Sequence, residues 1–356
     1  MAAADYSYVR SPRTVVLELD GSEGGGQLVR TALACSALTG EPFRMTAVRG
    51  GRPNPGLRPQ HLAAVRAAAA ACDAEVTGAE EGSERLAFDP GALAGGEYEV
   101  AVGTAGSVPL VLDAVLPVGY ALSAPLALRA TGGTDVKWAP TADHYRTVKL
   151  PLVRRAGLDA EATVRRRGFY PAGGGAATLS LSPSEPRPLD LVDRGPLRSV
   201  TVASVASEHL AEAEVAERQA EAAGERLDVP VPVESTVEYV ESDSPGSAVL
   251  VRGEYGESLA GFDALGERGR PAEAVGEAAA EAFERFDAGA AAVDGHAADQ
   301  LVLPLAVAGG RVAVPRVTDH VATNTELVRA FGADVRLVEP ESEPPRVVSD
   351  GGLDVR

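Results

Sequence analysis

The chain has 356 residues, of which 45% are apolar and only 4% aromatic, and its formal net charge at pH 7 is −18. This length favours two domains, or one domain with an insertion. The sequence shows no broad basic face for nucleic acid, and concentrated salt would screen such a face. Two cysteines, Cys35 and Cys72, make neither a disulfide framework nor a metal cluster, and their apolar helical neighbours predict buried thiols.

The acidic residues number 51 against 33 basic ones, and the only lysines are Lys137 and Lys149. Such a surface keeps a protein hydrated in brine, so we expect a salt-adapted source organism; a cationic partner is the alternative explanation. The polar N-terminus and the short, interrupted apolar runs predict no secretion signal and no membrane contact. We therefore expect a soluble cytoplasmic protein.

The first part of the chain alternates strands with helices. A strand at Val15–Leu19 leads through a glycine-rich loop into a helix that Gly40 ends, and a strand at Phe43–Val48 leads into a helix at Gln60–Asp73. Both helices begin with polar residues, at the end where anions are favoured.

A second, similar unit follows. Ser107 fits an N-cap before the apolar helix Val108–Leu116, in which Asp113 is the only charge. Because an unpaired buried carboxylate is costly, Asp113 faces a polar cavity or turns to solvent. A strand at Leu126–Ala130 and a helix at Asp143–Ala156 come next.

Three arginines, an aromatic pair, a proline and three glycines make up Arg165–Gly175, between strand-like segments. Glycine backbone and arginine side chains both suit phosphate, so this stretch is a candidate phosphate site. The alternative is a glycine-rich bend between strands, with a solvated basic edge.

The composition changes near Ser182, where proline- and acid-rich sequence begins. We expect a strand at Ser199–Val205, an acidic helix at His209–Leu227 and two further strands. The helix Ala272–Phe286 returns to the earlier pattern, and the apolar helix Leu301–Ala308 follows it. We interpret the region between Ser182 and the helix Ala272–Phe286 as an inserted module.

A third unit ends the chain. The strand Arg311–Val317 leads to His320, which we expect in a short loop before a helix. Thr323 and Glu326 have the spacing of a capping box for that helix. A strand at Val335–Val338 precedes a polar tail, so the strand–helix pattern recurs three times.

Three of the five histidines, His61, His296 and His320, lie near predicted helix N-termini. There the helix dipole favours a neutral imidazole, which can act as a nucleophile; an ordinary hydrogen-bonding role is the alternative for each. We expect His144 and His209 to be solvated. The chain has no Walker A motif, nucleophile elbow or zinc-type spacing.

Several of these segments together resemble the RNA 3′-terminal phosphate cyclase family, collinearly over nearly the whole chain, and the string Arg-Gly-Phe-Tyr-Pro-Ala-Gly-Gly-Gly is the most specific. The matching segments are Asp20–Arg30, Arg49–His61, Gly103–Ser107, Gly132–Asp135, Arg167–Gly175, Asp299–Gln300 and His320–Asn324. The resemblance implies an ATP-dependent ligase that converts an RNA 3′-phosphate into a 2′,3′-cyclic phosphodiester. The implied intermediates are a histidine–AMP adduct and an RNA-phosphate–AMP anhydride.

The resemblance also implies roles for individual residues. His320 matches the adenylylated nucleophile, and Glu23 matches a residue that places a divalent metal, Mg²⁺ or Mn²⁺, or the nucleotide. Residues matched to ATP binding are Asp113, His296, Ala297, Ala298, Asp299, Gln300, Glu23 and Arg30. Residues matched to the phosphates and the RNA end are Arg49, Arg52, Gln60 and His61. Asp113 and His296 depart from the bacterial pattern, where glutamine and tyrosine are found.

The implied fold is α/β (α+β), with a large domain of three repeated strand–helix units and a smaller inserted α/β domain. We place an N-terminal extension at 1–13, the large domain at 14–183 and 272–340, the inserted domain at 184–271 and a tail at 341–356. The glycine-rich stretch then becomes a structural turn. We expect RNA 3′-phosphate ends as partners and no obligate protein partner.

Two other classes of protein compete with this interpretation. One is a non-catalytic cyclase-like factor of ribosome assembly, which would bind RNA or protein but lack the histidine nucleophile. The other is an enolpyruvyl transferase, which shares a repeated architecture but lacks the glycine-rich string. His320, followed by Asn324, favours the cyclase.

Overall fold

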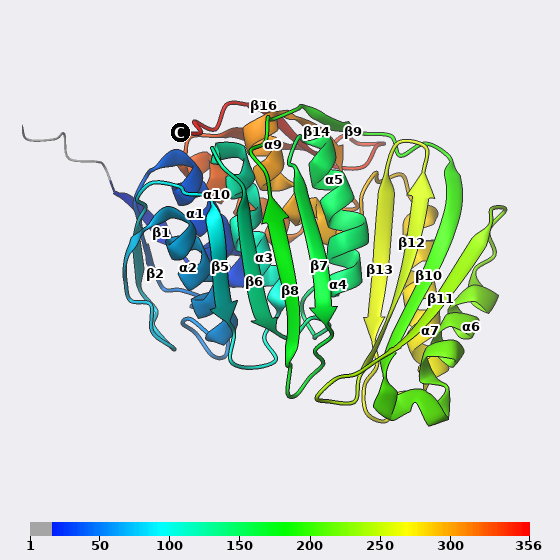
Figure 1. Ribbon diagram of the computed structural model, residues 1–356. Coiled ribbons are helices and arrows are strands. Elements are labelled where there is room, and N and C mark those ends of the chain that lie inside the picture. The colour runs from blue at the N-terminus through cyan, green and yellow to red at the C-terminus, as the bar shows by residue number, and fades with distance from the viewer. Residues whose placement is uncertain (1–15) are drawn as a thin grey trace, which may run out of the picture.

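The computed structural model describes residues 16–356, so the predicted extension at 1–13 lies outside the described residues. Within residues 16–356 the chain forms four four-stranded sheets covered by helices, which confirms the mixed α/β prediction (Figure 1). No helix in this part of the chain has the length and hydrophobicity needed to cross a membrane.

The first unit has the sheet order β1-β2-β4-β3, with β1 parallel to β2 and the other neighbours antiparallel. Helices α1 and α2 connect its strands and bury long apolar faces, which include Cys35 and Cys72 as predicted. Its elements are β1 (Leu17–Asp20), α1 (Gly26–Thr39), β2 (Phe43–Thr46), α2 (Pro59–Cys72), β3 (Glu75–Thr77) and β4 (Leu86–Asp89).

The second unit repeats this topology, with the sheet order β5-β6-β8-β7. Its middle helix contains one π-helical turn, at Tyr145–Lys149, between α4 and α5. Its elements are β5 (Gly96–Ala101), α3 (Val108–Val115), a 3₁₀ helix (Leu116–Ala121), β6 (Leu126–Gly132), α4 (Ala142–His144), α5 (Leu150–Arg155), β7 (Ala160–Arg166) and β8 (Gly175–Leu181).

The third unit has the equivalent order β9-β14-β16-β15, again with one parallel and two antiparallel pairings. The threefold repeat is therefore present. The elements of this unit are β9 (Leu189–Leu191), α8 (Gly295–Gln300), α9 (Val302–Ala308), β14 (Gly310–Ala313), α10 (Asp319–Ala330), β15 (Asp334–Val338) and β16 (Arg346–Gly351).

The fourth sheet lies between β9 and α8 in the sequence and at one side of the three units in space (Figure 1). Its order is β11-β10-β12-β13, and α6 and α7 pack on it to form a separate hydrophobic core. Its elements are β10 (Leu197–Ser207), a 3₁₀ helix (Glu208–Ala213), α6 (Val215–Arg226), β11 (Val233–Val240), β12 (Ser247–Tyr255), β13 (Leu259–Leu265) and α7 (Ala272–Asp287).

The division into domains stays a proposal, and the packing suggests three changes to it. β9 lies within the predicted inserted domain yet pairs with β14, so we assign it to the third unit. Val275 and Phe283 of α7 share the core of the fourth sheet, so we propose that the inserted domain extends past 271 to about 291. β16 lies in the predicted polar tail yet pairs with β14 and β15, so we assign it to the third unit.

The glycine-rich stretch forms the turn between β7 and β8, which pair antiparallel. Arg167 is buried and ion-paired with Asp135 and Asp143, at 3.2 and 2.7 Å, so it offers no free charge to a ligand. Arg166 pairs with Asp243 at 2.8 Å, which joins the turn to the inserted sheet. The stretch is thus structural.

Candidate functional site

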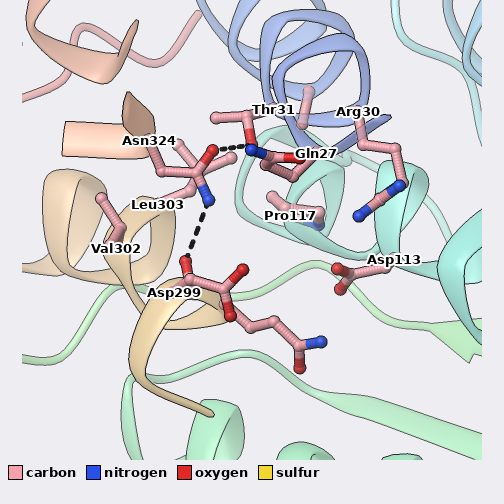
Figure 2. A pocket seen from close by; sticks show the side chains of 11 residues that line it. Gln27, Arg30, Thr31, Asp113, Pro117, Asp299, Val302, Leu303 and Asn324 are labelled. Atoms are coloured by element: carbon pink, nitrogen blue, oxygen red, sulfur yellow. Dashed lines mark hydrogen bonds between the residues drawn. The ribbon is translucent and has the colours of Figure 1, made fainter. Parts of the chain in front are cut away.

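The helices of all three units meet around a polar cavity of about 40 Å³ (Figure 2). It brings together four of the predicted site residues, Arg30, Asp113, Asp299 and Gln300, from positions far apart in the sequence. The cavity is lined by Gln27, Arg30, Thr31, Ala34, Asp113, Pro117, Asp299, Gln300, Val302, Leu303 and Asn324.

Asp113 lines the cavity and forms an ion pair with Lys149, whose side chain is only 2% exposed. Burial and the nearby Arg30 lower the pKa of Lys149, whereas Asp299 acts in the opposite direction. The unusual carboxylate in the apolar α3 is therefore paired, as its burial requires. The sequence analysis did not identify Lys149, because the pair joins residues 36 positions apart.

Arg30 extends from α1 into the same cavity. Burial lowers its pKa to about 10, although Asp299 opposes this shift, so the guanidinium stays charged at neutral pH. A charged arginine fork in a partly dry cavity is well suited to phosphate oxygens.

His320 lies at the edge of the site, with 51% of its side chain exposed, and its Nδ1 is 3.6 Å from Oδ2 of Asp299. Asn324 links the neighbouring helices: its Nδ2 donates to the backbone oxygen of Asp299 at 3.3 Å, and its Oδ1 accepts from Thr31 Oγ1 at 3.1 Å (Figure 2). Because Asp299 faces Nδ1, the opposite ring nitrogen, Nε2, is the one directed away from the carboxylate.

The predicted start of the last helix was wrong. α10 begins at Asp319, and Thr318 is its N-cap, with Oγ1 accepting the N–H of Val321. His320 therefore lies within the first helical turn, and the predicted capping box at Thr323 is part of the helix. Threonine is also a preferred N-cap residue, so Thr318 could have been predicted from the sequence. It was missed because the predicted strand extended to Val317, directly before it.

A second group of predicted residues surrounds the N-terminus of α1. His61 is 3% exposed, and its Nδ1 accepts the N–H of Arg58 at 3.0 Å, so Nε2 carries the proton. Burial and three arginines lower the pKa of His61 to about 3 and keep the ring neutral. A Cβ added to Gly26 would lie 2.2 Å from His61 Nε2, and one on Gly25 would lie 2.9 Å from Arg52 Nη2.

This group forms a cradle of donors at a helix N-terminus. No side chain caps α1, and its first turn contains no acidic residue. The His61 ring and the Arg52 side chain lie close against Gly25 and Gly26, so donors and the positive end of the helix dipole come together, a combination suited to an anion.

Three further predicted residues have other contacts. Arg49 donates to two backbone oxygens of its own loop, those of Asn54 and Gly56, at 2.9 and 2.7 Å. Gln60 Oε1 accepts the N–H of Ser107 at 3.2 Å and so joins two units. Glu23 is exposed in the loop before α1, and residues 16–356 contain no cluster of three or more potential metal ligands.

His296 is the second residue of α8 and contacts the inserted sheet, because its Nε2 lies 3.8 Å from Oδ1 of Asp263 in β13. Ala297 and Ala298 are buried in the same helix and offer only backbone atoms. The sequence analysis had no signal for Asp263, since its strand belongs to the inserted region.

His144 contradicts the sequence prediction that it is solvated. Its side chain is fully buried, and its Nε2 lies 3.2 Å from Oδ2 of Asp294. Polar neighbours in the sequence suggested an exposed face, but the π-helical turn and the inserted sheet enclose it. His209 is exposed, as predicted, with Nε2 3.3 Å from the backbone oxygen of Ser242.

A sequence model described as RNA 3′-terminal phosphate cyclase matches residues 21–336. The chain belongs to this family. It is 52% identical to an RNA 3′-terminal phosphate cyclase of Halobacterium salinarum, over 90% of this chain and 96% of that protein. Proteins of the same name from Pyrococcus furiosus and Ectopseudomonas mendocina are 42% and 40% identical, each over 88% of this chain and 92% of its own length.

A solved structure, the EPSP synthase of Acinetobacter baumannii, aligns with 96% of this chain and 66% of its own chain. The TM-score is 0.32 and the identity 13%, so this similarity supports no functional comparison. The family assignment depends on the sequence relatives.

Proposed function

We propose that this chain is an ATP-dependent ligase that converts an RNA 3′-phosphate into a 2′,3′-cyclic phosphodiester, with His320 as the nucleophile. Membership of the family supports the cyclase activity. One observation supports the choice of residue: His320 stands against Asp299 beside a cavity that also holds Arg30.

In the proposed first step, His320 Nε2 attacks the α-phosphorus of ATP. A nitrogen–phosphorus bond forms, the bond to the bridging oxygen breaks, and pyrophosphate leaves. The Asp299 carboxylate, 3.6 Å from Nδ1, would stabilise the positive charge that develops on the ring. His320 lies in the first turn of α10, whose dipole favours the neutral ring before attack and the negative phosphoryl group after it.

The remaining steps use the RNA end. An oxygen of the 3′-phosphate attacks the phosphorus of the histidine–AMP adduct, frees the ring and forms the RNA-phosphate–AMP anhydride. The neighbouring 2′-OH then attacks the RNA phosphorus, loses its proton and expels AMP. This attack is intramolecular, so little further positioning is needed once the phosphate is activated.

Two groups of residues would hold the phosphates. Arg30 faces the cavity, while Arg52, the His61 Nε2–H and the N-terminus of α1 form the cradle beside it. These donors are positioned before the reaction, and such donors stabilise developing negative charge. His296, with Asp263, is the proposed edge of the nucleoside site.

A divalent metal would mask the charge of the pyrophosphate leaving group. Mg²⁺ binds mainly through substrate phosphates and one or two carboxylates. Glu23 stays our candidate for such a carboxylate, and no step above depends on it.

A non-catalytic RNA- or protein-binding factor remains the alternative, and a labelling experiment separates the two. Incubation with α-labelled ATP and Mg²⁺ or Mn²⁺ should leave an acid-labile label on the protein, and His320→Ala should abolish it. His209→Ala is the matched control, because His209 lies in the inserted region and should leave labelling unchanged.

Two results would contradict the proposal. A folded wild-type protein that takes no label in suitable salt would exclude the adenylylation step. Label that persists in His320→Ala but disappears in His61→Ala or His296→Ala would place the nucleophile elsewhere. The product test is conversion of a 3′-phosphorylated oligoribonucleotide into a phosphatase-resistant form.

A further inference from the structure

A buried ion pair beside the candidate site joins three elements of the fold. His144 Nε2 donates to Oδ2 of Asp294, and the two side chains are 0% and 1% exposed. The same Oδ2 accepts the N–H of Gly261 in β13, at 3.0 Å. The other oxygen, Oδ1, accepts the N–H groups of His296 and Ala297, both at 2.9 Å, and so caps α8.

We propose that His144 is a positioning residue, which acts through Asp294 to hold α8 in place and thereby sets Asp299 at the reaction site. This inference depends on the proposed function only for its catalytic consequence. α8 has six residues, too few to fix its own orientation through internal hydrogen bonds, so its cap and packing must fix it.

The charges around the pair strengthen the contact. His144 faces Asp294 and the ring of His296, which is arranged edge-to-face with a distance of 5.3 Å between the ring centroids. Asp263 of β13 also faces it. Tyr145, the next residue in the chain, begins the π-helical turn. Burial favours a neutral ring, but Asp294 and Asp263 outweigh it and raise the pKa of His144. Although burial opposes ionisation of Asp294, His144 holds the pKa of that carboxyl at about 2.

The pair also couples the inserted sheet to the site. A Cβ added to Gly261 would lie 3.0 Å from His144 Cδ2 and 2.5 Å from Val148 Cγ2, so β13 packs directly on the second unit here. Asp263, two residues along the strand, accepts the N–H of Thr141 at 2.7 Å. A shift of β13 would therefore move the cap of α8.

The distance from the pair to the reacting ring is short. Asp299 lies five positions after Asp294, little more than one helical turn, and its Oδ2 is 3.6 Å from His320 Nδ1. Loss of the cap would misplace Asp299 against His320 and His296 against the nucleoside. Errors of about 1 Å in such positioning reduce rates by about 100-fold.

Three variants test the proposal. His144→Phe fills the space but removes the donor; His144→Gln keeps an N–H donor near the position of Nε2 and removes the charge. His209→Phe is the matched control, because it removes a ring nitrogen whose contact, the backbone oxygen of Ser242, lies within the inserted region. Each is measured by amide hydrogen exchange and by the KM for ATP and the kcat in the cyclisation of a 3′-phosphorylated oligoribonucleotide.

In His144→Phe we expect amide protection at His296 and Ala297 to fall at least about tenfold and the KM for ATP to rise about 10- to 100-fold. His144→Gln should recover most of both, and His209→Phe should match the wild type. A purely structural role would lower the melting temperature without this local exchange signal or its rescue.

Unchanged protection of α8 and unchanged KM in folded His144→Phe would overturn the inference. Should that variant not fold, Asp294→Asn replaces it, and unchanged exchange and KM there have the same meaning. Exchange is measured without ATP, so the inference can fail while the wild type labels normally. Absence of label on the wild type would instead contradict the proposed function.

Discussion

The two sides of the candidate site use histidine in opposite ways. At the N-terminus of α2, His61 is buried and surrounded by arginines, and these lower its pKa to about 3. On the other side, His144 of α4 faces Asp294, the N-cap of α8, and His320, in the first turn of α10, faces Asp299. One side offers a fixed neutral donor, and the other offers rings that a carboxylate can hold while they carry positive charge.

This comparison shows that a helix N-terminus does not by itself determine what a histidine does. His61 and His320 are both in the first turn of a helix of at least 12 residues, so the dipole acts similarly on both. Their neighbours differ in charge. We therefore assign anion binding to the arginine side and the nucleophile to the carboxylate side.

The largest effect is expected from Asp299→Asn. The amide cannot stabilise positive charge on His320, so we expect self-adenylylation to slow by about 10²- to 10⁴-fold. Asp319→Asn is the matched control, since Asp319 is an exposed carboxylate next to His320 and should change the rate little. Normal labelling in Asp299→Asn would contradict the assignment of the nucleophile to the side of the site that carries the carboxylates.

The next effect concerns the buried ion pair between Lys149 and Asp113. Lys149→Met leaves Asp113 partly buried without its partner, and we expect the free energy of unfolding to fall by about 3–5 kcal/mol. Urea unfolding at constant salt measures this. Asp113→Leu together with Lys149→Met should recover most of the loss, and a double variant as unstable as the single one would contradict the pairing.

The other lysine of the chain is the control for that experiment. Lys137 pairs with Glu267 at 2.8 Å, but the two side chains are 51% and 46% exposed. Exposed pairs contribute about 0–1 kcal/mol, so Lys137→Met should change stability little. A loss as large as that of Lys149→Met would mean that burial does not explain the difference.

A smaller effect is expected from Arg30→Lys, which keeps the charge but loses the planar fork. We expect the adenylylation rate to fall by about 10- to 100-fold at fixed ATP. Arg66→Lys on the exposed face of α2 is the control and should match the wild type. Full activity of Arg30→Lys would mean that a point charge is enough in this cavity.

The sequence and the structure agree where information is local or repeated. Strand–helix alternation predicted the units, and the apolar surroundings of Cys35 predicted its burial. The ion pairs of Lys149 and His144 could not be predicted, because each joins a residue of the second unit to another helix. Asp294 stands just before a helix, where an aspartate is an ordinary N-cap, and nothing local in the sequence connects it with His144.

The last prediction concerns the pH dependence of stability, in which His61 and His144 should contribute with opposite signs. An unfolded histidine takes up a proton near pH 6.5, but native His61 does so only near pH 3. Between these values the unfolded state binds more protons, so the stability contribution of His61 falls as pH falls, by about 1.4 kcal/mol per unit. His144 has a raised pKa, so its contribution is fully present below pH 6.5 and is lost as pH rises through its native pKa.

Two neutral variants convert this into a measurement. His61→Asn keeps an acceptor for the N–H of Arg58, and His144→Gln keeps a donor to Asp294. From pH 7 to 4.5, the stability of the wild type relative to His61→Asn should fall, whereas its stability relative to His144→Gln should rise. Urea unfolding at a fixed salt concentration gives both differences. If both stability differences changed in the same direction with pH, the two sides would not differ in the charge state that they favour for histidine.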